Sequence, residues 1–116
     1  MNQLLEQEIN QLHAEFCAGL ADPKRILMLY LLAEQPHNVT ELVSILNMSQ
    51  PAVSRHLKVL RDRGMVTATR VGPSVEYRLA DRRLIDALDL LRAALRDHLS
   101  HRAEIAGAIQ AEESIH

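Results

Sequence analysis

The stretch VTELVSILNMSQPAVSRHLKVLRDRG, residues 39–64, decides the fold of this 116-residue chain. It holds two short amphipathic segments separated by Asn47-Met48-Ser49, and Ser49 is a typical residue to cap the second one. Pro51 is tolerated in the first turn of a helix, and Gly64 is a natural residue for the helix to stop at. Two short helices joined in this way are typical of a helix-turn-helix.

The flanking segments add three helices and one strand pair. Apolar residues recur at helical spacing over residues 4–19 and from residue 82 to about 104, and Asp22-Pro23 opens an apolar helix over 24–34. The residues from Gln35 to Asn38 break the helical pattern, and Thr40 and Asp81 are expected to cap the helices that follow them. β-Branched residues over 65–71 and 75–79, joined by Gly72-Pro73-Ser74, predict a hairpin.

We therefore predict a mainly α fold with a small β-hairpin, in the order α-α-α-α-β-β-α. This order describes a winged helix-turn-helix that fills one domain over residues 1–116, with the helix-turn-helix at 39–64 and the wing at 65–80.

Composition excludes several other classes of protein. The chain has no Trp, one Phe and two Tyr, so it lacks an aromatic platform for single-stranded nucleic acid. Its single cysteine rules out an internal disulfide and a thiolate zinc finger. The longest apolar run, Ile26 to Ala33, is too short to cross a bilayer, and no basic segment typical of a signal peptide opens the chain. We expect a cytoplasmic protein without a membrane partner.

The net charge of −2 hides an uneven distribution. Residues 51–80 carry six Lys or Arg against two Asp or Glu, a local net charge of +4, whereas the rest of the chain carries seven against thirteen, a net charge of −6. Attraction to phosphates depends on the local patch, so the basic middle favours a nucleic-acid partner.

The second helix of the motif separates into two faces. Leu57 and Leu60 lie within about 40° of Val53 around the helix axis, and polar residues and cations lie on the far side. Such a face suits a recognition helix, whose first residues meet base edges while cations meet phosphates. Together with the wing, the candidate DNA contacts are Ser49, Gln50, Ser54, Arg55, His56, Lys58, Arg70 and Ser74.

Two alternatives stay open for this surface. One is a solvated basic helix face beside a loop, and the other is a winged-helix module that binds protein and no DNA. For His56, which flanks the apolar stripe, we expect either a packing role or a phosphate contact.

Several segments together resemble the ArsR/SmtB family of winged helix-turn-helix repressors. They are LADPKRI at 20–26, VTEL at 39–42, SQPAVSRHLKVLR at 49–61, Gly64-Met65-Val66 and Tyr77-Arg78-Leu79, within a similarity over roughly residues 15–100. The resemblance implies a homodimeric repressor that an inducing signal releases from a palindromic operator, with helices over 1–20 and 82–106 as the interface. At the wing turn this sequence has Gly72-Pro73 where the family has Gly-Arg.

The dimer is also expected on physical grounds. One short recognition helix buries too little surface to find a site in a genome, whereas a twofold pair reads two half-sites about 34 Å apart. The apolar stripes on the first and last helices supply the predicted dimer contacts, Leu5, Ile9, Leu12, Phe16, Leu88, Leu91 and Leu95.

A sensor site cannot be completed from the residues present. The family's cysteine pair is absent from residues 41–47, and His101-x-x-Glu104 matches half of its other metal site, whose partner positions hold Leu88 and Leu90. The remaining candidates for a zinc or nickel site are His13, Cys17, His98, His101 and Glu104. Alternatively, His98 and His101 are polar residues of the interface, His13 lies on the surface and Cys17 is a small buried apolar residue. No cofactor is therefore assigned.

Enzymatic motifs are missing as well. The sequence contains no G-x-S-x-G, no G-x-x-x-x-G-K and no H-E-x-x-H. We therefore predict a sequence-specific DNA-binding transcriptional regulator that is not an enzyme.

Overall fold

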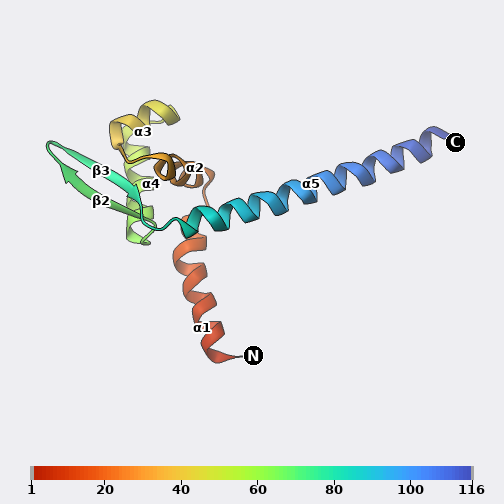
Figure 1. Cartoon of the computed structure of the whole chain (residues 1–116), viewed down its shortest axis with the longest axis horizontal. Helices are drawn as coiled ribbons and strands as arrows, with labels where there is room; N and C mark the ends of the chain where they lie inside the picture. The colour runs from red at the N-terminus through yellow and green to blue at the C-terminus, as the bar shows by residue number, and fades with distance from the viewer. Residues whose placement is uncertain (1, 116) are drawn as a thin grey trace. The chain divides into compact units, whose positions relative to one another are not determined.

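A computed structural model describes residues 2–115 of the chain. Most of its elements are helices (Figure 1). Three strands form one antiparallel sheet. In chain order the elements are α1 (Gln3–Leu12), a π-helix η1 (His13–Cys17), α2 (Pro23–Glu34), β1 (His37–Asn38), α3 (Val39–Leu46), α4 (Gln50–Asp62), β2 (Val66–Val71), β3 (Ser74–Leu79) and α5 (Arg83–Ile115).

The chain divides into two compact units, residues 1–82 and residues 83–116. The first unit contains the sheet and the helices up to α4, and the second is the single helix α5. The single domain over residues 1–116 therefore stays a prediction. None of the helices between residues 2 and 115 combines the length and the hydropathy of a bilayer-spanning segment.

Local capping chemistry sets most helix starts. Asp22 Oδ1 accepts a hydrogen bond from the amide of Lys24 at 2.8 Å, and Ser49 Oγ accepts one from Ala52 at 3.3 Å. Both caps were predicted from sequence. The cap of α3 was not, because Asn38 fills that role in place of Thr40.

The Asn38 cap is a complete capping box. Asn38 Oδ1 accepts from the amide of Glu41 at 2.8 Å, and Glu41 Oε1 accepts from the amide of Asn38 at 3.3 Å. This reciprocal pair satisfies two amides at once, which explains why the helix starts before Thr40. At the other end of α3, Asn47 adopts the left-handed conformation, with φ 53° and ψ 49°, and so turns the chain toward α4.

Three helices differ in part from the sequence prediction. The expected single helix over 4–19 changes at His13–Cys17 into a π-helical turn. The last helix, expected to end near residue 104, continues to Ile115. In α2, expected to be buried on most sides, Leu27 is half exposed.

The sheet contains a strand that the sequence pattern missed. Residues 37–38, expected to lie in a break, form β1 and pair with β3, so that the strand order is β1-β3-β2. His37 pairs with Tyr77 and Asn38 with Glu76. A strand of two residues is too short to show an alternating pattern.

The wing is the hairpin of β2 and β3, which extends to a free tip in Figure 1. Val71 pairs with Ser74, so Gly72 and Pro73 alone make the turn. Gly72 has φ +60°, and the ring of Pro73 forbids a positive φ at the next position. The turn is therefore of type II′, whose first central position requires glycine.

The core of the first unit is aliphatic, as the shortage of aromatic residues requires. It lies where α2, α3, α4 and the start of β2 meet, and this packing fixes the orientation of α4. Its fully or nearly fully buried side chains are Met28, Leu29, Leu32, Leu42, Val53, Leu57, Leu60, Met65 and Val66.

Candidate nucleic-acid interface

Helix α4 has one buried face and one exposed face. Val53, Leu57 and Leu60 are 0% exposed, which confirms the predicted core stripe. On the opposite side the polar and cationic side chains predicted to face DNA are exposed, namely Ser49, Gln50, Ser54, Arg55 and Lys58. The buried stripe turns one face of α4 toward the core, so these side chains point to solvent.

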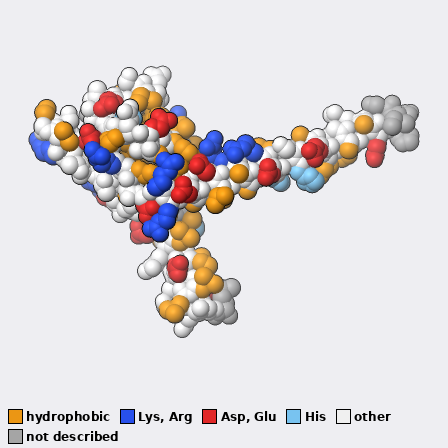
Figure 2. Space-filling model, in the orientation of Figure 1, with side chains coloured by type: hydrophobic (Ala, Val, Ile, Leu, Met, Phe, Trp, Pro, Cys, Tyr) orange, Lys and Arg blue, Asp and Glu red, His pale blue; other side chains and the backbone are white. Residues whose placement is uncertain are grey.

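Some cations of this surface are neutralised locally. Lys58 Nζ donates to Asp62 Oδ2 at 2.8 Å, and this hydrogen bond holds the pKa of Asp62 below its ordinary value of 3.8. Arg78 Nη2 similarly lies 2.7 Å from Glu76 Oε1. Basic and acidic side chains lie next to one another on the face of the molecule that Figure 2 shows.

Other cations remain available to a ligand. Within residues 2–115, the side chains of Arg55, Arg61 and Arg70 make no ion pair. Arg55 projects from the first half of α4, Arg61 from its last turn and Arg70 from β2 near the wing tip.

The wing places its two predicted contacts on opposite strands. Arg70 is exposed and pairs with Val75, and Ser74 is half-buried and pairs with Val71. Successive side chains of a strand alternate between faces, so Arg70 and Ser74 lie on different faces of the hairpin. Val71 and Val75 are also exposed beside the turn.

His56 differs from the other predicted contacts because it is largely enclosed, with 18% of its side chain exposed. Its Nδ1 lies 3.3 Å from Arg25 Nη1, and its Nε2 lies 4.0 Å from Asp22 Oδ2. The expected packing role therefore has a structural basis, and a phosphate contact stays a prediction. In the sequence, the segment from Asp22 to Arg25 was interpreted as a helix start and as part of the family resemblance, and its contact with His56 was not predicted.

A second polar contact joins His37 to α3. His37 is 4% exposed, and its Nδ1 lies 3.1 Å from Glu41 Oε2. This hydrogen bond, together with one from the amide of Asn38, holds the pKa of Glu41 below its ordinary value of 4.5. Sequence reasoning missed the pair because residues 35–38 were interpreted as a break between helices, and no pattern there indicates a side-chain contact with Glu41.

The predicted metal ligands are spread over two elements. His13 and Cys17 lie at the ends of the π-helix η1, where Cys17 is exposed, and His98, His101 and Glu104 lie on α5 in the other compact unit. Figure 2 shows histidine side chains beside hydrophobic ones on α5. In the described part of the chain, no three His, Cys, Asp or Glu side chains are grouped as metal ligands.

The expected dimer contacts are partly exposed. Leu5, Ile9 and Leu12 on α1 are each about half exposed, and on α5 Leu91 is 63% and Leu95 54% exposed. Phe16 is half-buried and Leu88 is 6% exposed, so most of their surface is already covered within one chain.

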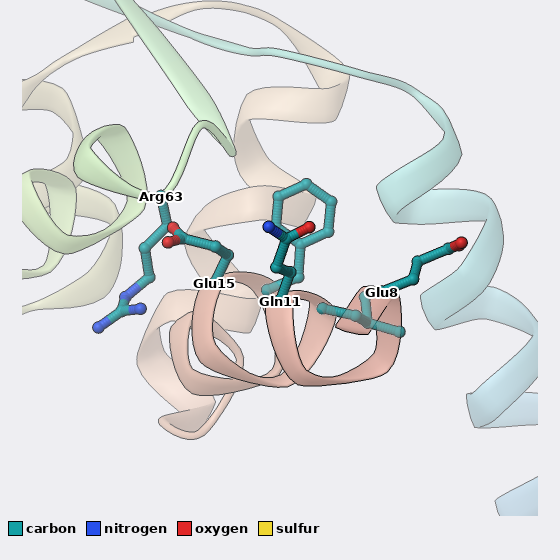
Figure 3. Close-up of a pocket in the computed structure, with 6 residues that line it drawn as sticks. Glu8, Gln11, Glu15 and Arg63 are labelled. Atoms are coloured by element: carbon teal, nitrogen blue, oxygen red, sulfur yellow. The ribbon is translucent and has the colours of Figure 1, made fainter. Parts of the chain in front are cut away.

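An open pocket of ≈ 320 Å³ lies beside the first helix. Figure 3 shows Glu8, Gln11 and Glu15 along one side of this helix, with Arg63 reaching toward it from the end of α4. Arg63 Nη1 donates a hydrogen bond to the carbonyl oxygen of Ala14. The pocket is lined by Glu8, Gln11, Leu12, Glu15, Phe16 and Arg63.

Comparison with known proteins shows which family this chain resembles. The family model described as "Bacterial regulatory protein, arsR family" matches residues 22–68, which contain α2, α3 and α4. The HTH-type transcriptional repressor SmtB of Mycobacterium tuberculosis is 45% identical over 78 residues, which cover 67% of this chain and 58% of that repressor. The chain thus spans about three-fifths of the length of this relative.

Other relatives match over nearly the whole chain. The HTH-type transcriptional regulator Rv0081 of Mycobacterium tuberculosis is 34% identical over 90% of this chain and 93% of its own length. Its crystal structure gives a TM-score of 0.73 at 35% identity, covering 89% of this chain and 99% of that one.

A solution structure agrees with this likeness. The homodimeric winged helix-turn-helix DNA-binding domain from Mycobacterium bovis gives a TM-score of 0.74 at 26% identity, covering 87% of this chain and 93% of that domain. The fold is therefore a winged helix-turn-helix, as predicted.

Proposed function

The chain belongs to the ArsR family of bacterial regulatory proteins, and from this premise we propose that it is a sequence-specific DNA-binding transcriptional repressor. The observation that carries the proposal is the two-faced helix α4. Its core stripe is fully buried, and its hydrogen-bonding and cationic side chains are exposed from the first turn onwards. A helix presented in this way can enter the major groove with its N-terminal residues against base edges.

The exposed residues divide into two roles. Gln50, Ser54 and Arg55 lie in the first half of α4 and are proposed to read base edges. Lys58 and Arg70 are proposed to contact phosphates, and Ser49 and Ser74 lie where their hydroxyls can add backbone contacts. No catalytic role is assigned to any residue.

We further propose that the repressor acts as a homodimer. The half-exposed apolar side chains on α1 and α5 support this assembly, and so does the homodimeric domain from Mycobacterium bovis. A twofold pair would place two recognition helices on half-sites one helical turn apart, about 34 Å. A DNA partner of this kind would place the protein in the cytoplasm.

The test is a titration of the full chain on the DNA upstream of its own coding sequence, followed by fluorescence anisotropy. Replacing Arg55 with Gln should weaken the complex by about 1–3 kcal/mol and leave the fold intact. Arg96→Gln, an equal charge change at an exposed position of α5, is the matched control. Unchanged affinity in Arg55→Gln would exclude this face as the DNA contact and favour a protein-binding module.

The inducing signal is tested with the same complex. Zinc, nickel, arsenite and a thiol oxidant are added in separate titrations, and a loss of affinity identifies the signal. Variants of His13, Cys17, His98, His101 and Glu104 then show whether the residues predicted from sequence respond to it. If no addition changes the affinity, a constitutive or protein-regulated repressor is favoured.

A further inference from the structure

The guanidinium of Arg25 connects three parts of the first unit. Its Nε donates to the carbonyl oxygen of Gly19 at 2.7 Å, and Nη2 donates to that of Ala18 at 3.3 Å. The remaining arm, Nη1, lies 3.3 Å from Nδ1 of His56 on α4. Arg25 is thus held at the end of the first helical segment and reaches the middle of α4.

The imidazole of His56 lies between two charged groups. A guanidinium has only donors, so the contact with Arg25 is a hydrogen bond in which Nδ1 of His56 accepts. The other ring nitrogen, Nε2, lies 4.0 Å from Asp22 Oδ2. Asp22 in turn caps α2 and lies 3.9 Å from Arg25 Nη1, so the charged groups that face the ring are Asp22 and Arg25.

Two further contacts hold α4 to the same segment. Arg63 at the end of α4 donates to the carbonyl oxygen of Ala14, within η1. Gly19 packs closely against the residues that end and follow α4, since a Cβ there would lie 3.2 Å from Arg63 Cδ and 2.7 Å from Met65 Sδ. Residues 14–19 are therefore bound to α4 at its middle and at its end.

We propose that Arg25 is a positioning residue for DNA recognition: through His56 it sets α4 relative to residues 14–19, and so carries displacements of the first helix to the recognition face. The role rests on the proposed function, because His56 is adjacent to Arg55 on α4. A rotation of α4 that moved His56 would move Arg55 with it, and hydrogen bonds to base edges tolerate little displacement.

The experiment compares two DNA probes. The first is the 30-base-pair duplex, roughly three helical turns, that the unaltered full chain enriches from a random pool. The second has the same base composition in scrambled order. Arg25→Lys keeps the charge but replaces the planar fork by a single ammonium nitrogen, which cannot reach all the acceptors that Nε, Nη1 and Nη2 contact. It should weaken binding to the enriched duplex about tenfold and to the scrambled duplex less than about twofold.

Arg96→Lys is the matched control and should alter neither affinity. His56→Leu should reproduce the loss caused by Arg25→Lys, because Nη1 loses its acceptor. His56→Asn should restore affinity to within about twofold, since its Oδ1 can accept from Nη1. Equal losses on both duplexes, or no rescue by Asn, would overturn the positioning role.

A measurement without DNA separates this proposal from the proposed function. Failure of the unaltered chain to enrich any duplex would reject the repressor assignment. Arg25→Lys should still accelerate amide hydrogen exchange over residues 55–60 about tenfold, with the core of α2 unchanged. Uniform acceleration across the first unit, or none in α4, would overturn the proposal that Arg25 holds this helix.

Discussion

Glu41 Oε2 lies 3.1 Å from Nδ1 of His37, and this contact joins the first turn of α3 to strand β1. The same carboxylate accepts the amide of Asn38, so one side chain closes both the capping box and the connection to the sheet. The hydrogen bond with His37 is the main cause of the lowered pKa of Glu41, followed by that with Asn38.

The lowered pKa predicts a pH-dependent contribution to stability. A carboxyl group whose pKa is depressed on folding stabilises the protein above its unfolded value, here 4.5, and loses that contribution as the pH falls through the folded value. Glu41→Gln keeps the capping geometry but removes the charge. Urea unfolding should show a variant less stable at neutral pH, with the difference shrinking below pH 4.5. A difference that stays constant with pH would contradict this, and Glu34→Gln at the exposed end of α2 is the control.

Gly19 is predicted to be required for its small size. An alanine Cβ would lie 2.7 Å from Sδ of Met65, which is fully buried, and 3.2 Å from Cδ of Arg63. Gly19→Ala should lower the free energy of unfolding by about 1–3 kcal/mol, measured with urea. In a chain that already carries Met65→Ala, Gly19→Ala should hardly change the free energy of unfolding.

A second glycine provides the control for that experiment. Gly107 lies in α5, and outside the backbone of that helix a Cβ there would meet no heavy atom of the described residues within 4 Å. Gly107→Ala should therefore stabilise the helix by about 0.5–1 kcal/mol. A similar loss of stability in both variants would show that crowding at Met65 is not the cause.

Asp62 is predicted to restrain DNA binding. Its carboxylate accepts from Lys58 Nζ at 2.8 Å and so neutralises a cation beside the recognition face. Asp62→Asn should raise affinity for any duplex about two- to fivefold and steepen the dependence on salt. Fluorescence anisotropy at several salt concentrations measures both effects. Asp97→Asn on α5 changes the net charge equally, and an identical gain there would show a general charge effect.

The exposed leucines of α5 predict where the dimer forms. Leu91→Lys combined with Leu95→Lys places two charges in an apolar stripe, and burying them between subunits would cost several kcal/mol. Sedimentation velocity should show this variant as a monomer at concentrations where the unaltered chain is a dimer. Leu90→Lys is the control, since Leu90 is 73% exposed and lies off the stripe. If Leu90→Lys were also monomeric, the dimer interface would have to cover more of α5 than this stripe.

The helix-turn-helix could be predicted from sequence because its signals are local. Ser49 caps α4 three residues before the amide that it binds, and the stripe of Val53, Leu57 and Leu60 shows the helical period directly. The wing could be predicted in the same way, because its turn depends on two adjacent residues, Gly72 with its positive φ and Pro73 with its restricted φ.

The missed features depend on contacts that no local pattern encodes. Arg25 and His56 are 31 positions apart, so only the packing of α2 against α4 brings them together. Strand β1 exists because β3 lies beside it, and the π-turn at His13–Cys17 interrupts a helical pattern without a Gly or Pro to mark it. The exposed face of α4 was predicted correctly, whereas the arginines that fix it in place were not.

The shortest strand has a consequence for how DNA would be read. Asn38 is both the cap of α3 and a strand residue paired with Glu76 of the wing, so the wing is joined to α3, the helix that packs against α4. This packing sets the distance between α4, which we propose enters the major groove, and the wing tip, which we propose reaches the DNA backbone. A duplex must match that length by its own groove width and curvature. Bases that no side chain touches would thereby influence affinity through their flexibility.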